Sequence, residues 1–316
     1  LEFRRVLFRS QAMKYIRLGK EGREVSRIVL GCMRIADKPL SRVEELLKTA
    51  LDSGVNMFDH ADIYGGGESE TRFKEAARKL GISREKIVLQ SKCGIRKGMY
   101  DFSKEHILSS VEGSLKRLGT DYLDVLLLHR PDALADPEEV DGAFDELYRS
   151  GKVKAFGVSN FSARQTELFN RGRYPIVANQ LQFSLMHSGM VDEGLNVNMA
   201  KAESVERGGE ILDYCRLKNI TVQAWSPLNY GMFEGIFVGN DKFPELNKEL
   251  SRLAEKYSCA PSAIAFAWIL RHPAGMQVIA GTTDPARLKQ LCASADISLT
   301  REEWYSLYLS TGKTLP

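Results

Sequence analysis

Four ionisable side chains stand at or just beyond the ends of short apolar segments. Asp59 and Tyr64 belong to the segment FDHADIYGGGESE, Lys92 precedes the last residue of IVLQSKC, and His129 closes YLDVLLLH. A carbonyl oxygen gains negative charge when hydride reaches its carbon, so carbonyl reduction needs a proton donor and an electrostatic stabiliser. Side chains of these types supply both, provided that the fold brings them together.

Tyrosine is the proton donor in this set. Its unperturbed pKa is about 10, which is too high for easy donation at neutral pH. A nearby ammonium group favours the phenolate and lowers that pKa, and Lys92 can supply this charge to Tyr64. Asp59 can hold Lys92 in place by charge pairing. His129 can donate a hydrogen bond to the carbonyl oxygen.

A metal site is the competing interpretation of the same region, because Asp59, His60 and Asp62 lie close together in the sequence. The five histidines are scattered over the chain, at positions 60, 106, 129, 187 and 272, and no third histidine has metal-ligand spacing. We therefore predict no metal. The glycines at 65–67 are expected to let the chain turn sharply beside the site, rather than to bind phosphate.

The chain must position these residues, and it alternates short strand-like runs with amphipathic helices eight times. The predicted strands are 28–33, 55–61, 87–93, 122–129, 155–160, 176–184, 221–228 and 277–282. Most are rich in apolar residues rather than strictly alternating, as is typical of parallel strands buried on both faces. Eight such units predict a closed (β/α)8 TIM barrel of the α/β class, in which catalytic groups come from the carboxyl ends of strands. An open doubly wound sheet is the rival, but no G-x-G-x-x-G motif follows the first strand.

Three further segments complete the predicted organisation. Residues 15–31 read as a β-hairpin that turns near Glu21 and covers the bottom of the barrel, and residues 300–310 read as an extra C-terminal helix. The barrel is expected to occupy 13–316 as a single domain. Residues 1–12 are interpreted as a non-native or disordered leader, with a transit peptide as the weaker alternative.

Charge and cysteine content narrow the class of protein. The formal net charge is +3, from 44 basic and 41 acidic residues among 316, so nothing favours a nucleic-acid or membrane partner. The five cysteines are widely spaced without a C-x-x-C motif, which predicts no disulfide framework and a reducing compartment, the cytoplasm. One sequence gives no rule for the oligomeric state.

The motifs together resemble the aldo-keto reductase family. FDHADIYGGGESE is similar to the family signature F-D-x-A-x-x-Y-G, and Lys92, His129 and the segment GVSN follow in the family's order. The resemblance extends from about Tyr15 to the C-terminus, and segments 177–199 and 304–316 resemble the YdhF-like oxidoreductase branch. It implies a catalytic tetrad in which Tyr64 is the acid, Lys92 adjusts the pKa of Tyr64, and Asp59 holds Lys92 in place. His129 either orients the carbonyl group or acts as an electrophile. His60 replaces the threonine common after the signature aspartate, and either shapes the pocket or makes a bland polar contact.

The resemblance also implies a nicotinamide cofactor, NADPH or NADP, with NADH as an alternative. Ser159, Asn160 and Gln180 match positions that hold the nicotinamide carboxamide, and Trp225 matches an aromatic residue stacked on its ring. The pyrophosphate segment corresponds to Ser226, Pro227 and Leu228. Thr282 and Arg287 match part of the 2′-phosphate site, where Gly281 replaces a lysine found in many members.

The sequence therefore predicts an NADP-dependent reductase of a small-molecule aldehyde or ketone. Two alternatives stay open: a cofactor-binding regulatory protein on the same fold, and a different barrel enzyme such as a phosphate-handling aldolase. The substrate is expected to be selected by the loops 93–102 and 226–240 and by the C-terminal segment.

Overall fold

The computed structural model describes residues 13–315 with the exception of residues 206 and 233. The leader predicted for residues 1–12 lies outside the described residues. Within the described part of the chain, no helix combines the length and the apolar composition that crossing a membrane requires.

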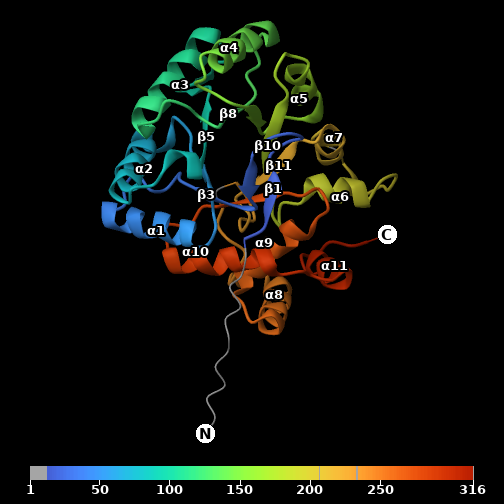
Figure 1. Cartoon of the computed structure of the whole chain (residues 1–316). Coiled ribbons are helices and arrows are strands. Elements are labelled where there is room, and N and C mark those ends of the chain that lie inside the picture. Colours follow the sequence, from blue (N-terminus) through green and yellow to red (C-terminus); the bar gives the residue numbers. More distant parts are fainter. Residues whose placement is uncertain (1–12, 206, 233, 316) are drawn as a thin grey trace.

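Eight parallel strands form a closed barrel at the centre of the molecule (Figure 1). Going round the barrel, they are β3 (Ile28–Gly31), β4 (Met57–Asp59), β5 (Val88–Cys93), β8 (Val125–Leu128), β9 (Phe156–Ser159), β10 (Ile176–Gln182), β11 (Thr221–Trp225) and β12 (Gln277–Ala280). All eight predicted strands are confirmed, although each is shorter than expected. Every residue of β3 and β8 is buried, which explains why such strands read as continuous apolar runs.

Helices surround the barrel, as Figure 1 shows. They are α1 (Leu40–Asp52), α2 (Glu68–Lys79), α3 (Lys104–Leu118), α4 (Pro137–Arg149), α5 (Ala163–Asn170), α6 (Gly189–Leu195), α7 (Ile211–Lys218), α8 (Pro244–Tyr257), α9 (Pro261–Arg271), α10 (Pro285–Cys292) and α11 (Arg301–Leu309). Short 3₁₀ turns occupy Tyr64–Gly67, Arg84–Lys86, Ala202–Ser204 and Ala293–Asp296. Each main helix turns an apolar stripe toward the strands. In α1 this stripe is Val43, Leu46, Leu47 and Ala50, at helical spacing.

The N-terminal hairpin closes the amino end of the barrel, as predicted. Its strands β1 (Tyr15–Arg17) and β2 (Glu24–Ser26) pair antiparallel. Leu18 and Val25 of the hairpin are buried in a cluster with residues from the barrel strands. The Gly19 amide donates a hydrogen bond of 2.9 Å to Thr221 Oγ1, at the start of β11. This packing leaves the opposite, carboxyl end of the barrel for a functional site.

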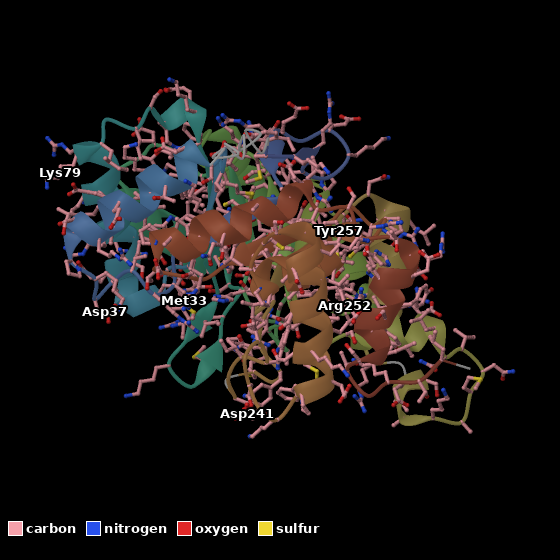
Figure 2. All side chains as sticks on the ribbon, turned by 90° about the horizontal axis from the view of Figure 1, so that it is seen from below. Met33, Asp37, Lys79, Asp241, Arg252 and Tyr257 are labelled. Carbon is pink, nitrogen blue, oxygen red and sulfur yellow. The ribbon has the colours of Figure 1, made fainter. Side chains whose placement is uncertain are left out.

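The extra C-terminal helix is also confirmed, as α11. Thr300 and Glu303 form a capping box at its start. Figure 2 shows α11 beside α8, where Arg252 and Tyr257 are labelled. The Tyr257 hydroxyl donates to a Glu303 carboxylate oxygen at 2.7 Å. The last helix is therefore attached to the outer ring of helices rather than to the barrel interior.

Candidate active site

The predicted tetrad meets at the carboxyl end of the barrel, around the Lys92 ammonium group. Lys92 Nζ donates to both carboxylate oxygens of Asp59, at 2.8 and 2.7 Å, and to the Tyr64 hydroxyl at 3.1 Å. It also donates to the His60 carbonyl oxygen at 2.8 Å. The His129 ring lies edge-on to the Tyr64 ring, with centroids 6.0 Å apart. Strands β4, β5 and β8 and the turn after β4 thus supply the four residues from neighbouring positions.

Lys92 is charged although it is completely buried. Burial alone lowers the pKa of an ammonium group, but the Asp59 carboxylate and the Tyr64 hydroxyl outweigh it and hold the pKa of Lys92 above its ordinary value. A buried charge needs a partner and hydrogen bonds, and Asp59 with the His60 carbonyl provides both.

The pKa of Tyr64 departs from the sequence-based expectation. Burial raises the pKa of this hydroxyl above its ordinary value, and Lys92 opposes that rise without cancelling it. The lysine therefore acts in the predicted direction, but it offsets desolvation rather than producing a net decrease. The result is a tyrosine that stays protonated at neutral pH, as a proton donor must.

His129 is a neutral side chain in this site. Burial, together with the positive charges of Lys92 and Arg130, lowers its pKa to about 2. Its Nδ1 atom is buried and has no hydrogen-bond partner. A neutral imidazole beside the tyrosine ring can donate a hydrogen bond to a carbonyl oxygen without adding a third cation.

His60 points away from the tetrad. Its ring packs edge-on against Phe73 of α2, with centroids 4.7 Å apart, and both ring nitrogens are buried without a hydrogen-bond partner. Burial and the nearby Lys92 lower its pKa to about 3. His60 lines neither of the two cavities at this end of the barrel. Neither suggestion made from the sequence, shaping the pocket or making a polar contact, agrees with this packing. Among the described residues, no group of three or more histidine, cysteine or acidic side chains is arranged to hold a metal.

Most of the predicted cofactor residues line one cavity, next to Asp59 and Tyr64. The members of the predicted set in its wall are Ser159, Gln180, Trp225, Ser226, Pro227, Leu228, Thr282 and Arg287. They come from β9, β10, β11, the segment after β11, the β12–α10 connection and the first turn of α10. Gly281 lines the same cavity and leaves open space where a longer side chain would stand.

Asn160 is the exception. It lines a second cavity that adjoins this one, and its side-chain amide is already hydrogen-bonded. Its Oδ1 accepts from Trp225 Nε1 at 3.0 Å, and its Nδ2 donates to Ser159 Oγ at 2.9 Å. Asn160 thus fixes the Trp225 ring. Asn160 and Ser226 both have left-handed backbone conformations, with φ of 63° and 49°. Such strain in non-glycine residues is concentrated at functional sites.

The start of α10 presents a cation at the far end of the cavity. Asp284 caps the helix by accepting from the Ala286 amide at 2.9 Å, and Thr282 Oγ1 accepts from the Asp284 amide at 3.1 Å. Arg287 lies in the first turn with its side chain exposed. A helix start with an arginine is suited to an anion, because the helix dipole and the arginine side chain both place positive charge there.

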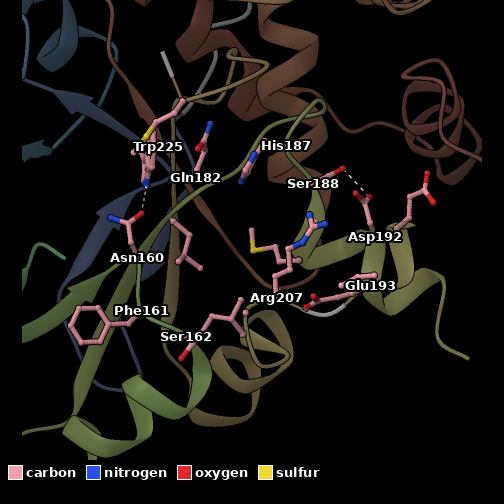
Figure 3. Close-up of a pocket in the computed structure, with 18 of the residues that line it drawn as sticks. Asn160, Phe161, Ser162, Gln182, His187, Ser188, Asp192, Glu193, Arg207 and Trp225 are labelled. Atoms are coloured by element: carbon pink, nitrogen blue, oxygen red, sulfur yellow. Dashed lines mark hydrogen bonds between the residues drawn. The ribbon is translucent and has the colours of Figure 1, made fainter. Parts of the chain in front are cut away.

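Two features of the site were not predicted. Arg34 lines the cavity next to Asp59 and Tyr64 and stands three residues beyond β3, where the rule for carboxyl ends of strands would have included it. A second cavity of about 670 Å³ adjoins the first and shares Arg130 and Trp225 with it. The segment after β10 forms its far side, with His187, Asp192 and Glu193 (Figure 3).

The expected substrate loops need correction accordingly. Segment 226–240 does contribute to both cavities, but 93–102 and the C-terminal segment contribute to neither. Residues 95–100 fold back as the small hairpin of β6 (Ile95–Arg96) and β7 (Met99–Tyr100). The C-terminal helix packs on α8 and α9.

Comparison with known proteins agrees with this geometry. Residues 27–308 match the model of the aldo/keto reductase family. A 6-dehydroglucose reductase of Agrobacterium fabrum is 35% identical over 310 residues, covering 92% of this chain and 96% of the relative. Oxidoreductase YdhF of Escherichia coli is 34% identical, covering 92% and 95%.

Solved structures give the same answer. The thermostable aldo-keto reductase Tm1743, crystallised with the inhibitor epalrestat, superposes with a TM-score of 0.77 at 28% identity, covering 94% of this chain and 100% of that structure. These relatives give no support to a regulatory role without chemistry. The family model matches nearly the whole chain, and the closed barrel brings a tyrosine, a lysine, an aspartate and a histidine together at its carboxyl end. This protein is therefore an oxidoreductase of the aldo-keto reductase family, with YdhF among its homologues.

Proposed function

We propose that this chain reduces an aldehyde or ketone to an alcohol with NADPH, and that Tyr64 donates the proton to the carbonyl oxygen. The observation that carries the proposal is the contact of Lys92 Nζ with both Asp59 and the Tyr64 hydroxyl. The hydroxyl belongs to a residue in the wall of the catalytic cavity, so a substrate oxygen bound there can reach it.

Each residue of the tetrad has a separate task in this proposal. Tyr64 gives up its proton as negative charge develops on the substrate oxygen. Lys92 stabilises the phenolate that this leaves, and Asp59 keeps the ammonium group in place. Neutral His129 donates a second hydrogen bond to the same oxygen, which orients the carbonyl.

The polar groups of the cavity fit a nicotinamide dinucleotide, which when bound supplies the hydride. Ser159 and Gln180 offer hydroxyl and amide groups suited to a carboxamide. Trp225 has a flat apolar face held in place by Asn160. Arg287 and the first turn of α10 suit the phosphate that distinguishes NADPH from NADH.

The adjoining cavity is the proposed substrate space. Its wall combines apolar side chains with His187, Gln182 and Arg207. Gln182 Nε2 is buried without a hydrogen-bond partner, which leaves a donor for a polar substrate group. A hydroxylated carbonyl compound fits such a wall better than an alkyl aldehyde does.

The test is consumption of NADPH, followed by its absorbance, with a panel of carbonyl compounds. The panel should contain alkyl and aryl aldehydes, ketones, sugar aldehydes, and 6-dehydroglucose because the Agrobacterium relative reduces it. We expect turnover with at least one class. Tight NADPH binding, seen as quenching of protein fluorescence, without any turnover would favour the regulatory alternative instead.

A further inference from the structure

Four glutamine side chains fill the barrel interior below the catalytic cavity. Gln90, Gln180, Gln223 and Gln277 are between 0 and 3% exposed. Branched apolar residues usually occupy this place in a TIM barrel. An amide buried without partners costs free energy, so a layer of amides needs a complete set of hydrogen bonds.

The hydrogen bonds of this glutamine layer are almost complete. Gln90 and Gln223 exchange two amide hydrogen bonds, of 2.9 and 3.1 Å. Gln180 Nε2 donates to Gln223 Oε1 at 3.1 Å, and Gln223 Nε2 donates to Gln277 Oε1 at 2.9 Å. The Gln277 amide then donates to the Ser26 carbonyl oxygen at 2.8 Å, at the closed end of the barrel.

The layer ends on the catalytic carboxylate. Asp59 Oδ1 accepts from Gln90 Nε2 at 2.6 Å and from Gln180 Nε2 at 3.0 Å, in addition to Lys92. The sheet register places Asp59 beside Gln90, and Gln223 beside both Gln180 and Gln277. A carboxylate oxygen has acceptor positions for all three donors, so the two amides and Lys92 together fix the orientation of Asp59.

The same layer fixes which atom Gln180 presents to the cavity. Both its N–H groups are used inside the barrel, by Asp59 and Gln223. Its oxygen makes no hydrogen bond to the described residues, and Gln180 lines the catalytic cavity. Gln180 therefore offers a ligand a hydrogen-bond acceptor.

We propose that Gln90 and Gln223 are positioning residues of the reductase. They act through Asp59, whose carboxylate they keep aimed at Lys92, and through Gln180, whose acceptor they turn toward the cavity. The Lys92 ammonium group then stays in contact with Tyr64. This inference rests on the proposed roles of Asp59, Lys92 and Tyr64.

Gln90→Glu tests the proposal with a change of one atom. A protonated glutamic acid at position 90 can still donate to Asp59, whereas an ionised one repels it. Two adjacent buried carboxyl groups hold one proton between them up to a higher pH than a single exposed carboxyl group does. We expect kcat relative to wild type to be within about tenfold at pH 5.5 and to fall a further 10- to 100-fold by pH 8. Gln90→Met, which cannot donate, should be low at every pH.

Gln277→Glu is the matched control, because Gln277 is equally buried and does not touch Asp59. Rates are normalised to the concentration of NADPH-binding sites, found by fluorescence titration, so that loss of folded protein does not count. We expect the kcat of Gln277→Glu to follow the pH dependence of wild type. Gln223→Leu should weaken NADPH binding at least threefold through Gln180.

The outcomes separate this inference from the proposed function. Wild type that binds NADPH and reduces no carbonyl compound would overturn the proposed function. Active wild type with Gln90→Glu and Gln277→Glu declining in parallel would show that the layer is only structural. A flat ratio of Gln90→Glu to wild type between pH 5.5 and 8 would overturn the positioning role by itself.

Discussion

The Lys92 ammonium group and the Tyr64 hydroxyl lie 3.1 Å apart in a site where Lys92 is only 1% exposed. In such a place the lysine offsets part of the cost of burying a phenolate. Lys92→Met should therefore raise the pKa of Tyr64 further and reduce kcat by about 10²- to 10⁴-fold, the range typical of general acid catalysis.

The pH–rate profile distinguishes this role from simple loss of packing. Since the rate requires protonated Tyr64, the alkaline decrease in the residual activity of Lys92→Met should move to higher pH. Lys97→Met, on the exposed turn after β6, serves as the control and should match wild type. A Lys92→Met profile with the wild-type alkaline limb would count against the tuning role.

We expect buried His60 to make the free energy of unfolding sensitive to acid. Its pKa is about 3 in the folded protein and about 6.5 when unfolded, so the unfolded chain binds the extra proton between those values. Stability is consequently lost as pH falls through this window, by about 2 kcal/mol at pH 5. His60→Leu should remove that part of the loss, measured as the free energy of urea unfolding at pH 7.5 and pH 5. If wild type and variant lose the same free energy of unfolding between pH 7.5 and pH 5, His60 binds its proton equally well in the folded and in the unfolded protein.

We expect Arg287 to determine the preference for NADPH over NADH. Charge-assisted hydrogen bonds to phosphate contribute about 1.5–3 kcal/mol, and Gly281 supplies no second cation. Arg287→Ala should lower kcat/KM for NADPH by about 10- to 40-fold and leave the value for NADH nearly unchanged. Lys289→Ala on the same helix is the control. Equal use of both cofactors by wild type would contradict the assignment.

The barrel and the tetrad were accessible from the sequence because both leave local signals. Parallel strands buried on both faces read as apolar runs, and Asp59, Lys92 and His129 stand where those runs end. The helix after strand β10 and the cavity beside it left no such signal, because α6 has only seven residues, too few to show a clear helical period in the sequence. Its position follows only from its packing beside the site.

The glutamine layer could also be predicted only in part from the sequence. Gln90 and Lys92 are two residues apart, so they share a face of β5, and this parity is visible in the sequence. Gln223 is 133 residues from Gln90, and only closure of the barrel brings their amides together. The pKa of Tyr64 could not be predicted either, because its sign depends on how completely the hydroxyl is buried.

The most direct test of the account is the Tyr64→Phe variant. The substitution removes the proton-donating hydroxyl and leaves the ring beside His129. We predict NADPH binding within about threefold of wild type by fluorescence titration, and kcat lower by 10² or more with the best carbonyl substrate. Near-normal kcat in this variant would contradict the assignment of Tyr64 as the acid.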